Sequence, residues 1–94
     1  MTEIIFNNKK VDCIKNWQLN TKENEDNLAK LEVVCELGSN LMDIFDEINN
    51  MSDANFILDN KIIFTIVRMN TMSIVPASDN VNQVLSCYGK WKMI

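Results

Sequence analysis

The chain of 94 residues contains no histidine. This absence excludes the Ser-His-Asp and Cys-His mechanisms of nucleophilic catalysis, and it removes imidazole as a general base or metal ligand. Cysteine does not fill the gap, because Cys13, Cys35 and Cys87 are widely spaced, form no Cys-x-x-Cys pair and are too few for a zinc site. We therefore predict no catalytic residue, no metal site and no cofactor. The cysteines are interpreted as free, mostly buried thiols in a reducing compartment.

Glycine and arginine are also scarce. The chain has two glycines, Gly38 and Gly89, so it cannot form the glycine-rich loops that cradle phosphates or dinucleotides. A single arginine and a pI near 4.6 disfavour direct binding of nucleic acid.

Long hydrophobic runs are missing as well. No stretch of 18 apolar residues is present, and the first residues lack the pattern of a secretory signal, so we expect no membrane association. Asn, Ile and Lys, which AT-rich codons encode, contribute 14, 11 and 8 residues. This composition favours a low-GC bacterium, or a virus or mobile element of one, and a protein located in the cytoplasm of the host cell or in a virion.

What the chain does contain predicts one small α+β domain over residues 1–94. Alternating and apolar runs over 3–6, 10–19, 28–37, 56–58, 61–70 and 72–75 indicate an antiparallel sheet of five to six strands built from hairpins. Asn7-Asn8 and Asp59-Asn60 suit the tight turns of two of these hairpins. The run 62–67 is apolar on both faces, which is typical of a central strand.

One helix is predicted over about 40–51. Leu41, Ile44, Phe45 and Ile48 recur at the spacing of one helical face, and Ser39 or Asn40 can cap the start. A second helix is predicted over about 79–88, with a strand over 84–88 as the alternative.

Acidic residues are concentrated in one part of the chain. Residues 23–53 hold nine acidic residues and one lysine, a net charge of −8, while the remaining residues sum to +4. Such a distribution guides the approach of partners more than it determines a fold. The alternative interpretation is a solvated surface that aids solubility.

These observations favour a non-enzymatic intracellular protein-binding module. Its partner would be a protein with a basic surface, and its type would be a phage or mobile-element inhibitor, or an immunity protein, that occludes the partner. The acidic residues expected to bind are Glu23, Glu25, Asp26, Asp43, Asp46 and Glu47.

A second hypothesis is a structural subunit of a phage particle or another homo-oligomeric assembly. Trp91, Met93 and Ile94 form an apolar tail that is expected to mediate self-association, because such residues are rarely left in water. A third hypothesis is a small-ligand-binding protein with a pocket between sheet and helix, lined by Trp17, Phe45 and Tyr88.

Overall fold

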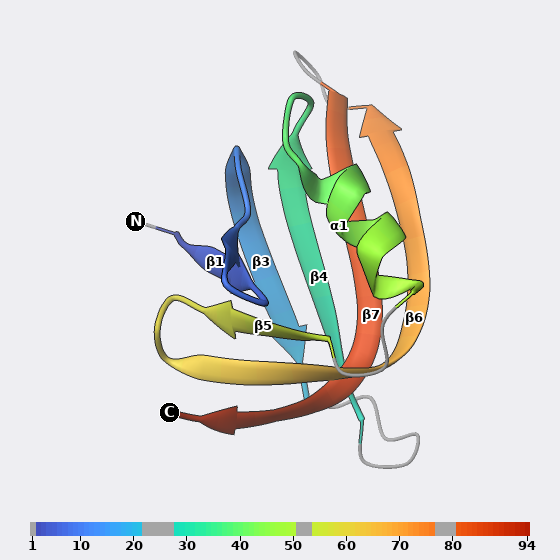
Figure 1. Cartoon of the computed structure of the whole chain (residues 1–94). Coiled ribbons are helices and arrows are strands. Elements are labelled where there is room, and N and C mark those ends of the chain that lie inside the picture. Colours follow the sequence, from blue (N-terminus) through green and yellow to red (C-terminus); the bar gives the residue numbers. More distant parts are fainter. Residues whose placement is uncertain (1, 22–27, 51–53, 77–80) are drawn as a thin grey trace.

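The computed structural model describes residues 2–21, 28–50, 54–76 and 81–94. Over these residues seven strands form one antiparallel sheet and a single α-helix packs on it, so the predicted α+β class is confirmed (Figure 1). In chain order the elements are β1 (Ile4–Phe6), β2 (Lys9–Lys10), β3 (Ile14–Asn20), β4 (Ala29–Glu36), α1 (Leu41–Ile48), β5 (Asn55–Leu58), β6 (Ile62–Pro76) and β7 (Val81–Met93).

The strands lie side by side in the order β2-β1-β5-β6-β7-β4-β3. The prediction of a central strand for residues 62–67 is confirmed, because β6 is the fourth of the seven. The sheet has more strands than the five to six predicted, for two reasons. The predicted strand 10–19 is divided between β2 and β3, and β7 is an additional strand. The predicted strands 61–70 and 72–75 are one continuous strand, β6.

β7 corrects the prediction of a second helix over about 79–88. Residues 81–88 are extended, and 79–80 lie outside the described residues. The helical spacing of the apolar residues there is also compatible with a strand, since Leu85 and Cys87 alternate onto the buried face. β4 and β6 pair with β7 along both of its sides, and this long-range pairing overrides the ambiguous local pattern.

The predicted hairpin turns are confirmed by the backbone. Asn7 and Asn8, which join the paired residues Phe6 and Lys9, have φ values of 43° and 71°, the positive angles of a two-residue hairpin turn. Asp59 and Asn60, with φ values of 50° and 56°, lie with Lys61 in the connection between the paired residues Leu58 and Ile62. Cys13, with a φ of 58°, interrupts the predicted strand 10–19 and redirects the chain from β2 to β3.

α1 covers the inner face of the curved sheet, where it lies in front of β7 and contacts it (Figure 1). The described helix is shorter than the predicted 40–51, and it buries Leu41, Ile44 and Ile48. These side chains meet a core that the strands supply: Ile4, Phe6, Val11, Ala29, Leu31, Val33, Cys35, Ala54, Phe56, Leu58, Phe64, Leu85 and Cys87.

Asp59, in the β5–β6 turn, links the two ends of the curled sheet. Its carboxylate accepts hydrogen bonds from the Glu3 backbone N–H (2.6 Å) beside β1 and from Trp17 Nε1 (2.9 Å) on β3. The hydrogen bond from Glu3, together with that from Trp17, holds the pKa of Asp59 below its usual value. β3 is thereby held against a turn that lies far from it in strand order.

Candidate protein-interaction surfaces

The acidic face of α1 is the first candidate surface. Asp43 and Asp46 are exposed on it, whereas Glu47 is partly buried and forms an ion pair with Lys9, with Oε1 2.8 Å from Nζ. Glu23, Glu25 and Asp26, the other acidic residues predicted to bind a partner, lie outside the described residues.

Asn40, at the start of α1, brings a basic segment beside this acidic face. Its amide nitrogen donates to the Lys10 carbonyl (3.0 Å), and its amide oxygen accepts from the Asp12 N–H (2.9 Å). The β1–β2 hairpin is therefore held against the helix, and Lys9 reaches Glu47. The charge segregation seen along the sequence is partly undone in three dimensions, since Lys9 pairs with Glu47 near the end of α1.

The last residues of β7 form the second candidate surface. β4 pairs with β7 as far as Ala29 opposite Gly89, and beyond Gly89 β7 has β6 as its one neighbour among the described residues. We call residues 90–94 the C-terminal edge. Figure 1 shows it as the red end of β7, extending past β4 alongside the first part of β6.

Some backbone groups of the C-terminal edge point away from β6 and have no partner among the described residues. Ile94 N–H donates to the Lys61 carbonyl (2.9 Å), so this amide points toward the β6 side. In an antiparallel pair these groups alternate in direction from one residue to the next, and each residue's N–H and C=O point the same way. The N–H and C=O of Trp91 and Met93 therefore point away from β6, toward the open side.

Three exposed apolar side chains belong to the C-terminal edge, with Trp91 and Met93 on one face and Ile94 on the other. Trp91 is 42% exposed, Met93 65% and Ile94 69%. Trp91 lies opposite the buried Phe64 on β6, and directly opposite residues share a face of the sheet. Trp91 and Met93 thus extend the core face of the sheet beyond the core itself.

The opposite face of the same edge is basic. Lys90 and Lys92 are both exposed, and neither forms an ion pair with a described residue. With Ile63, Thr65 and Trp91 they line a shallow hollow of about 220 Å³. The C-terminal edge therefore combines backbone groups that have no described partner, an apolar face and a pair of positive charges. The sequence analysis identified Trp91, Met93 and Ile94 but missed Lys90 and Lys92. The signal for them was the alternation of lysine with apolar residues over 90–94.

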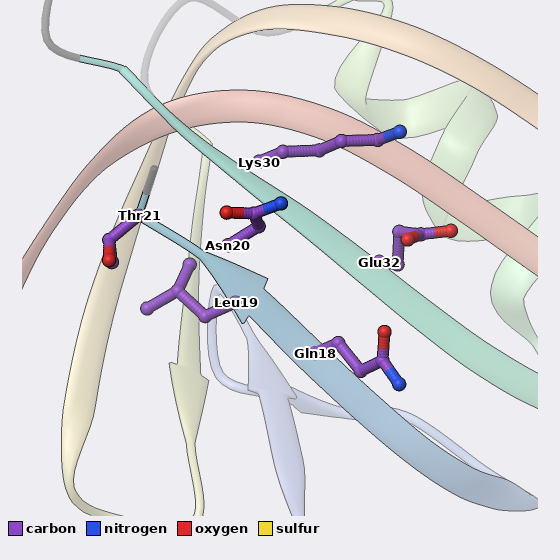
Figure 2. A pocket seen from close by; sticks show the side chains of 6 residues that line it. All are labelled: Gln18, Leu19, Asn20, Thr21, Lys30 and Glu32. Atoms are coloured by element: carbon purple, nitrogen blue, oxygen red, sulfur yellow. The ribbon is translucent and has the colours of Figure 1, made fainter. Parts of the chain in front are cut away.

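A wide polar hollow of about 570 Å³ lies over β3 and β4 (Figure 2). It is lined by Gln18, Leu19, Asn20, Thr21, Lys30 and Glu32. It is not the pocket proposed from the sequence for a small ligand. Trp17 shares the inner face with Val33 and Leu85, whereas Tyr88, three residues further along β7, lies on the outer face. The structure therefore does not bring Trp17 and Tyr88 to one pocket.

The cysteines differ from one another in accessibility. Burial raises the pKa of Cys35 and raises that of Cys87 to about 12, so neither is a reactive thiolate at neutral pH. Cys13 is exposed, which corrects the expectation that it belongs to the core. Among the described residues no group of three or more Cys, Asp or Glu side chains could hold a metal ion.

Comparison of the chain with protein-family models, curated proteins and solved structures finds no match. Within the described part of the chain, no helix has the length and apolarity needed to cross a membrane.

Proposed function

We propose that this protein is a non-catalytic protein-binding module and that it binds its partner along the C-terminal edge. One observation carries the proposal: beyond Gly89, β7 has no described neighbour on its open side, and its apolar side chains Trp91, Met93 and Ile94 are exposed there.

A sheet edge without a neighbour can pair with any extended chain, and charged side chains such as Lys90 and Lys92 limit which chains do so. Here Trp91 and Met93 direct their N–H and C=O groups to the open side and expose large apolar surfaces beside them. Backbone hydrogen bonds supply affinity and the alternating side chains supply selectivity when a strand is added to a sheet. Both elements are present in the C-terminal edge.

Site-specific photo-crosslinking tests this proposal. A photoreactive amino acid replaces Met93, or replaces Asn16 on the exposed edge strand β3 as the matched control, in the cells that produce the protein. We expect one discrete protein adduct from position 93 that disappears when Trp91→Ser is added, and no such adduct from position 16. Equal adducts from both positions, or none from position 93, would overturn the proposal.

The acidic face of α1 supports a second candidate function, occlusion of a basic partner surface, as in a phage or mobile-element inhibitor or an immunity protein. The observation that favours it is the exposure of Asp43 and Asp46, neither of which has an ion pair with a described residue. Charges of this kind speed encounter and select among partners. Binding that falls steeply with salt and is lost in the variant carrying Asp43→Lys and Asp46→Lys would support this function, and binding that survives both changes would exclude the helix face.

A further inference from the structure

We propose that the C-terminal edge accepts an added strand from a partner in which acidic residues alternate with apolar residues. This inference rests on the proposed function, and it specifies the chemistry of the partner segment.

The alternation follows from the two faces of the edge. Trp91 and Met93 lie on the core face and Lys90 and Lys92 on the outer face, because successive side chains of a strand point to opposite sides. A strand that pairs with this edge repeats the same alternation. Its apolar residues would meet Trp91 and Met93, and its acidic residues would meet the two lysines across the strand.

Charge also decides between a partner segment and a second copy of this chain. If two C-terminal edges paired symmetrically and antiparallel, only residues of the same face could lie opposite each other. In the registers that place Trp91 opposite Met93 or opposite Trp91 of the other copy, Lys92 would face Lys92 or Lys90. Only the register that places Met93 opposite Met93 sets Lys92 opposite Ile94, and of the C-terminal edge it pairs residues 92–94 alone. Like charges directly opposite are destabilising, and opposite charges contribute about 0.2–1 kcal/mol per pair. The two lysines thus favour an acidic partner over self-pairing.

The net charge of −4 does not oppose this arrangement at close range. Exposed charges further apart than about 8 Å are largely screened at physiological ionic strength, so an acidic side chain at the edge responds mainly to the nearest cations. Those are Lys90 and Lys92, which flank the hollow of about 220 Å³ on the outer face.

Fluorescence anisotropy with a defined peptide tests the inference on the full chain. The probe is a labelled peptide in which glutamate and valine alternate over six residues between Gly-Ser ends. Three comparison peptides carry lysine in place of glutamate, the same residues in block order, or N-methylated valines that cannot donate a hydrogen bond. We expect the alternating glutamate peptide to bind at least about tenfold more tightly than each of the three.

Two pairs of variants locate the binding. The variant with Lys90→Glu and Lys92→Glu should lose about tenfold or more in affinity, whereas the one with Lys10→Glu and Lys15→Glu, which has the same change in net charge, should keep the affinity of the original chain. Met93→Pro removes an N–H that points to the open side and should abolish binding, while Met93→Ala keeps that N–H and should lose only the apolar contact of the Met93 side chain, a smaller loss than that of Met93→Pro. Amide NMR spectra of the free variants establish that each one is folded.

Three results would overturn the inference: no binding of the alternating glutamate peptide, equal binding of its lysine counterpart, or equal loss in the two charge-reversal variants. A light-scattering mass of a dimer or larger species that Met93→Pro converts to a monomer would assign the edge to a second copy instead. In each case a position-specific crosslink from Met93 would leave the proposed protein-binding function standing, so the two proposals can fail separately.

Discussion

Replacing Gly89 with alanine should destabilise the fold far more than the size of one methyl group suggests. Gly89 lies in β7 between Ala29 of β4 and Ile66 of β6, at the position where pairing with β4 ends. A β-carbon there would overlap the Thr65 carbonyl oxygen and come within 2.9 Å of the Phe64 ring. The main obstacle is backbone of the central strand, which cannot rotate away as a flexible side chain can.

The size of the effect follows from this overlap. Adding atoms to a tightly packed interior costs about 1–3 kcal/mol, and a backbone obstacle places this site near about 3 kcal/mol. A chain of this length has a free energy of unfolding of about 5–14 kcal/mol. The same loss corresponds to a fall in Tm of about 12–24 °C, at about 4–8 °C for each kcal/mol.

Gly38→Ala is the matched control. Gly38 has a φ of 97°, but no heavy atom lies within 4 Å of its would-be β-carbon. Its substitution therefore carries only the cost of a left-handed backbone, about 1–2 kcal/mol. Urea unfolding of both variants, followed by Trp fluorescence, measures the difference. If Gly89→Ala proved no more destabilising than Gly38→Ala, the described approach of β6 to β7 would be wrong.

Two further predictions concern Asp59 and the thiols. The folded-state pKa of Asp59 lies below its unfolded value of about 3.9. The carboxylate therefore contributes to the free energy of unfolding above that pH, and this contribution is lost as the pH falls through the folded-state pKa. Asp59→Asn should therefore lower the free energy of unfolding at pH 7. The variant's free energy of unfolding should also decrease less than that of the original chain when the pH falls below about 4. If urea titrations showed that the substitution lowers the free energy of unfolding equally at pH 7 and pH 3, the assignment would be contradicted. A thiol-specific reagent should modify one cysteine, Cys13, in the native protein and all three after unfolding, because Cys35 and Cys87 are buried; rapid native modification of Cys87 would show that the core is open.

The local patterns predicted those parts of the fold that depend on local chemistry. Leu41, Ile44 and Ile48 lie on one helical face in the sequence and on the buried face of α1 in the structure. Asn7 and Asp59 occupy turns whose positive φ values asparagine and aspartate tolerate well. In each case the evidence lies within a few neighbouring residues.

The remaining features depend on partners that are distant in sequence. Pairing with β4 and β6 decides that residues 81–88 form a strand and not a helix. The spacing of Val84 and Leu85 does not distinguish between the two. The pairing of Lys9 with Glu47 joins residues 38 positions apart and reduces the acidic face that the sequence suggested. Among the described residues, the pairing of β4 with β7 ends at Ala29 and Gly89, a limit that the alternation of residues 28–37 does not reveal.

The most direct test of an open C-terminal edge is residue-resolved amide hydrogen exchange of the free protein. The structure predicts alternation: the amides of Lys92 and Ile94, directed to β6, should exchange slowly, and those of Trp91 and Met93, directed to the open side, should exchange rapidly. Equal protection of all four amides would contradict the account, because it would mean that the edge is already paired. Equally rapid exchange of all four would contradict it too, because β7 would then not extend beyond Gly89 as a strand.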